Sequence, residues 1–270
     1  MMFELELVEL QSADAAVRFE AARRLGDMPH ARTTAALMDT LNDSSAKVQY
    51  AAVSSLIKHN DPSALGPMLN VLLSSPDSSL WKLIVLGAGL RLRAGLLDMV
   101  AAGDTDTADR VLPALNSPSF NAHQQALFTR MLGRTGDTRQ SDRLLALLSS
   151  DDDVLRTAAA EALGWMGETR AVEPLIVILQ SPDDHEAVRE VAAEALGRLG
   201  DLAAVEPLID VLGDTSEWLR RAAAVALGDL GDHRAIEPLS DLLRDESTMV
   251  QDAAFDSLKK LSDHRYASLN

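Results

Sequence analysis

The sequence contains no cysteine, which excludes disulfides, thiolate metal sites, thiol nucleophiles and cysteine-held iron–sulfur clusters. Aromatic residues make up only 4% of it. Positive charge is also scarce, because 25 Lys and Arg stand against 41 Asp and Glu, for a formal net charge of −16. This balance argues against nonspecific binding to nucleic acid and against attachment to anionic membranes, since both need surplus Lys and Arg.

Long uncharged apolar runs are missing as well. The closest approach, LWKLIVLGAGLRLRAGLLDMV at 80–100, is interrupted by Lys82, Arg91, Arg93 and Asp98, whereas a membrane-spanning helix needs about 18 or more apolar residues in a row. The beginning of the chain, MMFELELVELQ, lacks the basic region and apolar run of a signal peptide. We therefore expect a cytoplasmic protein without a membrane segment.

What the sequence has in abundance is repetition. TAAAEALGWMGETRAVEPLIVILQ at 157–180 is followed by two close copies, which begin at Val191 and Arg221. The leucine of the Ala-Leu-Gly phrase or its equivalent recurs, mostly at intervals of 31 residues, at Leu25, Leu56, Leu132, Leu163, Leu196, Leu227 and Leu258. The longer gap between Leu56 and Leu132 has room for one further repeat and an insertion, which gives about eight repeats.

Each repeat predicts two helices. The first carries apolar residues at helical spacing, such as Val172 and Leu175, and an Asp- and Ser-rich turn leads to the second. The second helix has a stripe of small and apolar residues that includes Leu155, Ala162 and Leu163. A glycine followed by Asp or Glu is expected to end it in the left-handed conformation, at Gly26, Gly136, Gly167, Gly200 and Gly231. Such a unit cannot bury its own apolar face, so the repeats should stack into an α-solenoid.

Residues 77–117 depart from this pattern, because the segment is too long for one repeat and is rich in glycine. We expect a helix near 78–92, an irregular stretch at 94–105 and a helix near 106–115. One interpretation is a degenerate repeat with an insertion that serves packing. The other is a hinge or binding loop that divides the solenoid.

The predicted domain organisation is a single solenoid over 1–270. Under the hinge interpretation it separates into an N-terminal part, 1–93, and a C-terminal part, 105–262. Residues 263–270 follow the last repeat and predict a frayed tail.

The phrase V/L-R-x-x-A-A-x-A-L-G-x-hydrophobic-G-D, followed by A-V-E-P-L, stands at 155–168, 188–201 and 219–232 with small departures. It resembles the short HEAT-like repeat found in the phycobilin lyase group. The resemblance implies an all-α, right-handed solenoid. For function it implies, as one alternative, a bilin lyase or lyase-like subunit in phycobiliprotein maturation or turnover. The matching residues are structural ones, and the same repeat occurs in noncatalytic adaptors.

One arginine recurs directly after the first apolar position of the second helix, at Arg18, Arg156, Arg189 and Arg220. In the structural interpretation it pairs with a turn aspartate of its own or an adjacent repeat, such as Asp14, Asp152 or Asp184. In the functional interpretation the arginines form a ladder that binds a ligand.

Candidate catalytic groups are sparse. The histidines lack a second ligand at metal-binding spacing, and neither a phosphate-binding loop nor a nucleophile elbow is present. HEAT-repeat deoxyhypusine hydroxylases look superficially similar but use four His-Glu pairs, of which only His185-Glu186 has a counterpart here. We expect no metal and no cofactor. Whether the chain is an enzyme stays open, and a bilin-lyase type of activity is the alternative.

The second helices are expected to line the concave side of the solenoid. Counted from the first apolar residue of that helix as position zero, positions 2, 6 and 10 should project into the groove. Over most of the chain these positions offer cationic and aromatic anchors, namely Phe19, Arg23, Tyr50, Lys58, Lys82, Arg130, Arg134, Trp165 and Arg198, with Ala126 also among them. Near the C-terminus they are mixed to acidic, namely Glu190, Glu194, Arg221, Val225, Asp229, Asp252, Asp256 and Lys260.

Arginine and aromatic residues are typical anchors of interfaces. A groove lined with them suits an acidic segment of a partner protein, or a flat anionic ligand such as a bilin. The sequence therefore predicts a noncatalytic adaptor or scaffold that holds a protein partner in its groove, with the bilin-handling protein as the alternative. A plainer interpretation is that these long side chains merely cover a solvated face.

Overall fold

The computed structural model describes residues 3–74, 80, 109, 111–113, 115 and 117–267, with side chains as far as Ser262. All regular structure in these residues is helical, as predicted. They form two compact units, one of the residues up to 80 with 117–120, the other of those from 109 to 115 with 121–267. The predicted irregular stretch at 94–105, and Lys82, lie outside the described residues.

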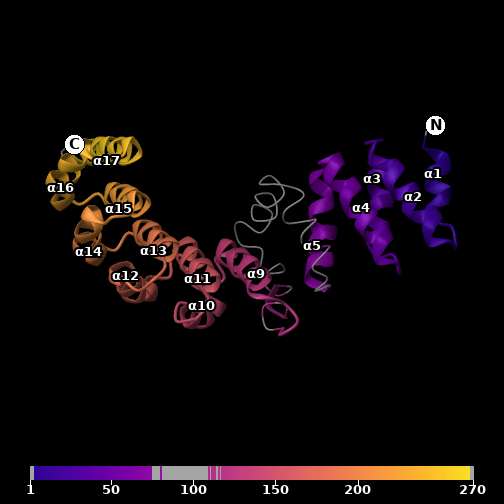
Figure 1. Ribbon diagram of the computed structural model, residues 1–270, viewed down its shortest axis with the longest axis horizontal. Coiled ribbons are helices and arrows are strands. Elements are labelled where there is room, and N and C mark those ends of the chain that lie inside the picture. Colours follow the sequence, from indigo (N-terminus) through magenta and orange to yellow (C-terminus); the bar gives the residue numbers. More distant parts are fainter. Residues whose placement is uncertain are drawn as a thin grey trace. The chain divides into compact units, whose positions relative to one another are not determined.

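The first unit contains two complete helix pairs and the beginning of a third (Figure 1). Its elements are α1 (Glu4–Glu9), α2 (Ala15–Leu25), α3 (Ala31–Thr40), α4 (Ala46–His59), the 3₁₀ turn η1 (Pro62–Ala64) and α5 (Leu65–Ser74). The second helices α2 and α4 pack against each other, and α3 packs on α4.

The second unit repeats the same pair. Its longer, second helices are α9 (Ala122–Thr135), α11 (Asp153–Met166), α13 (Glu186–Leu199), α15 (Glu217–Leu230) and α17 (Thr248–Ala267). Between them lie the outer elements η3 (Thr138–Gln140), α10 (Ser141–Leu147), η4 (Thr169–Ala171), α12 (Val172–Gln180), η5 (Leu202–Ala204), α14 (Val205–Asp210), η6 (Val211–Gly213), η7 (His233–Ala235), α16 (Ile236–Asp241) and η8 (Leu242–Arg244). Figure 1 shows the second helices in succession, with α10, α12, α14 and α16 along one side. This is the stacking of an α-solenoid.

The Gly-Asp pairs mark the boundaries between helices for a local reason. Gly136, Gly167, Gly200 and Gly231 have φ between 68° and 73°, the left-handed region in which a side chain is strained. The acidic residue that follows caps the next turn, as where the Asp201 carboxylate accepts a hydrogen bond from the backbone N–H of Ala203 at 2.9 Å. In the first unit Asn60 takes the place of the glycine, with φ of 50°.

The expectation for Gly26 is wrong. Its φ is −60°, in the right-handed region, and it belongs to a different set of glycines. A Cβ on Gly197 would lie 2.8 Å from the Cα of Ala226 in the next second helix, and a Cβ on Gly26 would collide in the same way with Ser55. These glycines therefore let adjacent second helices touch. Gly26 directly follows its leucine, whereas the left-handed Gly167 lies four residues after Leu163.

The last helix departs from the expected end of the chain. The frayed tail was expected from residue 263, but α17 continues through Ala267. The earlier second helices stop at a left-handed glycine, whereas α17 has no glycine and no proline that could stop it. No helix among the described residues has both the length and the apolar character needed to cross a bilayer.

Candidate partner-binding groove

The four repeat arginines are engaged between adjacent repeats. Each guanidinium pairs with a turn aspartate of the following repeat, in Arg18–Asp43 at 2.6 Å, Arg156–Asp184 at 2.9 Å, Arg189–Asp214 at 2.9 Å and Arg220–Asp245 at 2.8 Å. Each also donates to a backbone carbonyl near the turn before its own helix, as Arg220 does to Asp214 O at 2.8 Å. At most 16% of any of these arginine side chains is exposed. The donors are thus directed at the protein's own turns, and we call this row the arginine ladder.

Three carboxyl groups held by the ladder, those of Asp43, Asp214 and Asp245, have a lowered pKa. The hydrogen bond from Arg18 lowers the pKa of Asp43, and that from Arg220 lowers the pKa of Asp245. Burial acts in the opposite direction on Asp214, but the Ser216 N–H and Arg189 together still leave its pKa lowered. These carboxyls are therefore charged at neutral pH, and their charge stabilises the folded state.

A second row of ion pairs joins the outer elements. Arg139, Arg170 and Arg234 each reach back to the preceding outer helix, to Asp109 at 2.9 Å, Asp142 at 2.7 Å and Glu206 at 3.0 Å. Each also pairs with the helix-capping carboxylate two residues earlier. Through these contacts Arg170 and Arg234 lower the pKa of Glu168 and of Asp232 to about 2. The equivalent residue in the repeat between them is Ala203, so the row is interrupted there.

In the first unit, the predicted groove residues lie on α2 and α4. Phe19 is half-buried, and 44% of Tyr50 is exposed. Arg23 is exposed and pairs with Glu20 on its own helix at 3.0 Å. Lys58 pairs at 2.8 Å with Asp27, which holds the equivalent position one repeat earlier.

In the second unit, the predicted cations also meet groups of the same chain. Arg130 pairs with Glu161 of the next repeat, and only 13% of its side chain is exposed. The guanidinium of Arg134 lies over the ring of Trp165, 5.2 Å from the centroid. Arg198 pairs with Glu194 at 3.1 Å. The positive charge that the sequence predicts for this face is therefore largely balanced by the protein itself.

One predicted position is corrected. The sequence spacing places Ala126 in the groove, but its side chain is fully buried. In α9 the residue counted as position zero is Gln124, whose polar side chain is itself buried. Leu127, Phe128 and Thr129 are buried as well, so α9 is covered on more than one side.

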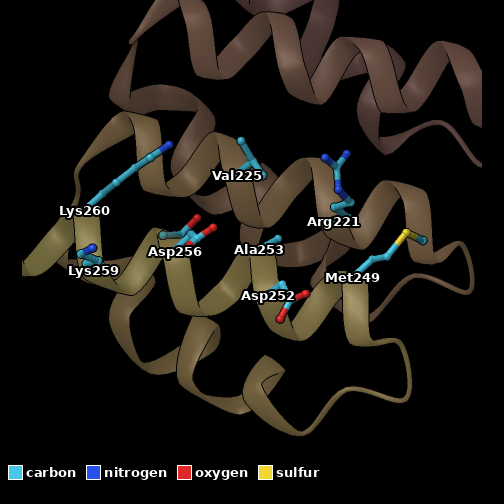
Figure 2. Close-up of a pocket in the computed structure, with 9 residues that line it drawn as sticks. Arg221, Val225, Met249, Asp252, Ala253, Asp256, Lys259 and Lys260 are labelled. Atoms are coloured by element: carbon cyan, nitrogen blue, oxygen red, sulfur yellow. The ribbon is translucent and has the colours of Figure 1, made fainter.

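Two hollows among the described residues lie near the C-terminal end of the second unit. An open groove of about 630 Å³ runs between α15 and α17. Figure 2 shows Arg221 and Val225 on one of these helices and Met249, Asp252 and Asp256 on the next. A smaller hollow of about 140 Å³ lies between α13 and α15, is lined by Glu194, Arg198 and Asp229, and shares Arg221 and Val225. We call this combined surface the α13–α15–α17 groove.

This groove consists mainly of positions 2, 6 and 10 of three successive second helices. Among the predicted anchors, only Arg198 lines it. Sequence reasoning missed Met249, which lies one turn before position 2 on the same helix face. Its equivalent one repeat earlier is Trp218, whose side chain is 46% exposed. The sequence could have indicated both residues, because helical spacing extends the face of positions 2, 6 and 10 by one turn to Trp218 and Met249.

The groove is lined by apolar side chains and by charges of both signs, with Arg198, Arg221, Lys259 and Lys260 against Glu194, Asp229, Asp252 and Asp256. Lys260 pairs with Asp229 at 2.7 Å. Burial, together with the neighbouring carboxylates of Glu194 and Glu186, raises the pKa of Glu190, and Arg221 partly opposes this shift. Asp252 and Asp256 are exposed, and neither takes part in an ion pair with another described residue. The described His, Asp and Glu residues form no group of three that could hold a metal ion.

Comparisons with known proteins agree with this geometry. The family model for HEAT repeats matches residues 5–84, 108–187 and 172–259. Solved structures with a similar fold include an engineered protein, with 22% identity, a TM-score of 0.57 and coverage of 96% of this chain and 78% of that one. YibA of Escherichia coli has 16% identity and a TM-score of 0.52, with 95% and 92% covered.

The complex of CpcE and CpcF of phycocyanin lyase from Nostoc sp. has 21% identity and a TM-score of 0.45, with 97% of this chain and 95% of that one covered. At these identities the likeness concerns the fold alone. No curated protein gives a significant match to the sequence.

Proposed function

Because the chain belongs to the family of HEAT-repeat proteins, we propose that it is a noncatalytic scaffold whose second helices hold a protein partner. The observation that carries this proposal is the α13–α15–α17 groove, an open hollow of about 630 Å³ with Met249, Val225 and Arg221 in its lining. Stacked repeats offer extended surfaces of this kind, and methionine and arginine are common in interfaces.

The same proposal extends to the second-helix face of the first unit, where Phe19, Tyr50 and Arg23 are accessible to different degrees. An acidic partner was expected from the cationic positions of the sequence. The pairing of Lys58, Arg130 and Arg198 with carboxylates of this chain removes much of the charge on which that expectation rested. An acidic partner would have to displace these contacts.

The test is affinity capture from an extract of the source organism, followed by mass spectrometry. The groove variant combines Val225→Thr with Met249→Glu. The matched control makes the same changes on outer elements, as Val177→Thr with Leu243→Glu, where 67% and 42% of the side chains are exposed. Circular dichroism establishes that both variants keep their helical content.

We expect a partner that is retained by the wild type and the outer variant and lost by the groove variant. A partner that is lost by the outer variant and kept by the groove variant would contradict the proposal. A visible absorption band in the eluate, with no protein bound, would instead support the bilin-handling alternative.

A further inference from the structure

The last repeat exposes apolar side chains at positions that the repeat before it buries. The exposed fraction is 39% for Ile236, 42% for Leu243 and 62% for Phe255. The equivalent residues one repeat earlier are at most 7% exposed and belong to the core of the second unit, namely Val205, Leu212 and Ala224. We call the exposed set, which lies on α16, η8 and α17, the α16–α17 end face.

The end face is not shaped for a further repeat of the same kind. Where α15 has Gly228 against the next second helix, α17 has Lys259. One turn earlier, Phe255 stands where the three preceding second helices each have a buried alanine. The larger side chains would keep another second helix from approaching as closely. The arginine ladder also stops here, because Gln251 takes the place of its arginine and donates to Asp245 O of its own repeat at 2.6 Å.

Two charges of opposite sign flank Phe255 on α17. Asp252 lies three residues before it and Lys259 four residues after it, so the three side chains form one row along the helix. Figure 2 shows Asp252 and Lys259 on α17. Both are exposed, and neither makes an ion pair with another described residue. Because they stand two turns, about 10 Å, apart, each is left for a group outside this helix.

This row is complementary to a reversed copy of itself. If two α17 helices pack antiparallel about a two-fold axis next to Phe255, Asp252 of each copy lies opposite Lys259 of the other, and the two phenylalanines meet at the centre. The same rotation keeps α16 of one copy beside α16 of the other, which covers Ile236 and Leu243 as well. A parallel pair would instead place aspartate on aspartate and lysine on lysine. The balanced charges of the row therefore favour a second copy of the chain over a partner of one charge.

We infer that the α16–α17 end face binds a second copy of this chain through an antiparallel two-fold contact of α17, with Phe255 at its centre and two Asp252–Lys259 ion pairs between the copies. This inference goes beyond the proposed scaffold function and does not depend on it. The face is about 22 Å long and about 20 Å wide, which is less than the roughly 800 Å² that each partner contributes to a standard interface. The dimer should therefore dissociate at low micromolar concentration.

The test is sedimentation equilibrium of the full chain at about 0.15 M salt, over roughly 1 to 100 µM. We expect a monomer that converts to a dimer and to nothing larger, because a two-fold contact closes on itself. Phe255→Ser should weaken the association at least about tenfold. Leu5→Ser is the control, since it changes an apolar side chain of α1 that is 65% exposed, and it should leave the association unchanged. Circular dichroism establishes that both variants keep their helical content.

Charge reversal tests the antiparallel register. Asp252→Lys alone and Lys259→Asp alone each place like charges across the contact twice, so each variant should be monomeric. An equimolar mixture of the two should dimerise again, because one copy then has only lysines at these positions and the other only aspartates. Glu173→Lys makes the same change of charge as Asp252→Lys at an exposed position of the outer helix α12, and it should dimerise as the wild type does.

A wild type that stays monomeric up to the highest concentration would overturn the inference. So would a dimer that survives Phe255→Ser, or a mixture of the charge variants that associates no better than either alone. Assemblies that grow beyond a dimer and are lost with Leu5→Ser would replace it with a head-to-tail contact. The captured partner takes no part in these measurements, so each of these results leaves the scaffold proposal standing. That proposal fails separately, through capture that does not depend on the groove.

Discussion

Arg220 gives the most demanding test of how the repeats are held together. Its guanidinium places two nitrogens at 2.8 Å from the two carboxylate oxygens of Asp245, and a third donor at 2.8 Å from Asp214 O. Only 7% of the Arg220 side chain and 8% of the Asp245 side chain is exposed. The Arg220→Met variant keeps the bulk of the side chain but leaves a buried carboxylate and a carbonyl without these partners.

Removing one member of a buried ion pair costs about 3–5 kcal/mol. The Ser247 N–H still donates to Asp245 at 2.9 Å, which favours the lower end of that range. Arg198→Met is the matched control. Its guanidinium makes one contact with Glu194 and is 37% exposed, so its loss should cost less than about 1 kcal/mol.

The effect should depend on pH with a definite sign. Arg220 lowers the pKa of Asp245 in the folded protein, so the stabilisation is present above the ordinary pKa of an aspartate. It is lost as pH falls through the lowered value. The difference between wild type and Arg220→Met should therefore be largest near neutral pH and shrink in acid.

Urea unfolding followed by tryptophan fluorescence measures this difference. Trp165 and Trp218 both belong to the second unit, and a Trp81→Phe background leaves these two as the reporters. Adding Asp245→Asn to Arg220→Met should recover part of the lost stability, because the unpaired charge is gone. If Arg220→Met lowers the free energy of unfolding by less than about 1 kcal/mol, or by an amount that does not change with pH, the stabilisation attributed to this ion pair is refuted.

Three further outcomes are expected from the same unfolding measurements. Gly197→Ala should destabilise the second unit by about 1–3 kcal/mol, because its Cβ would collide with Ala226. Gly213→Ala in η6 of the same unit, where a Cβ would have nothing within 4 Å, should be neutral or stabilising by up to about 1 kcal/mol. Equal effects would count against the close packing. Ala203→Arg should stabilise by about 0.5 kcal/mol by reaching Asp201 and Glu173, which completes the outer row of ion pairs, and an unchanged urea midpoint would argue against that row. Glu190→Gln should raise the free energy of unfolding at neutral pH, because the raised pKa of Glu190 means that its charged form is disfavoured in the folded state. This gain should vanish as pH falls through that pKa, since the wild-type carboxyl then takes up its proton. A gain that does not change with pH would contradict this reasoning.

The sequence predicts best those features, such as helix ends and caps, that depend on residues adjacent in the chain. Gly167 and Gly200 end their helices in the left-handed conformation because the stop needs a residue without a side chain, and the following acidic residue caps the next turn. Gly26 shows the limit of local reasoning. The dipeptide Gly26-Asp27 matches the stop signal, but its distance from Leu25 places the glycine at a crossing between helices instead.

The groove depends on contacts between repeats, which the sequence carries only in part. Helical spacing identifies positions 2, 6 and 10, and the structure brings those of α13, α15 and α17 to one surface. Helical spacing alone does not indicate where along the row a hollow forms. The pairs Asp27–Lys58, Arg134–Trp165 and Asp229–Lys260 each join residues 31 apart. Aligning the repeats and reading across them at equal positions would have found these pairs.

Photocrosslinking at single positions tests most directly whether the second-helix face is where the partner binds. A photoreactive benzoylphenylalanine replaces Met249 in the groove, and in a separate protein it replaces Val177 on the outer helix α12. Each is irradiated with the captured partner. We expect a covalent product from position 249 and none from position 177. A product from position 177 with none from position 249 would contradict it.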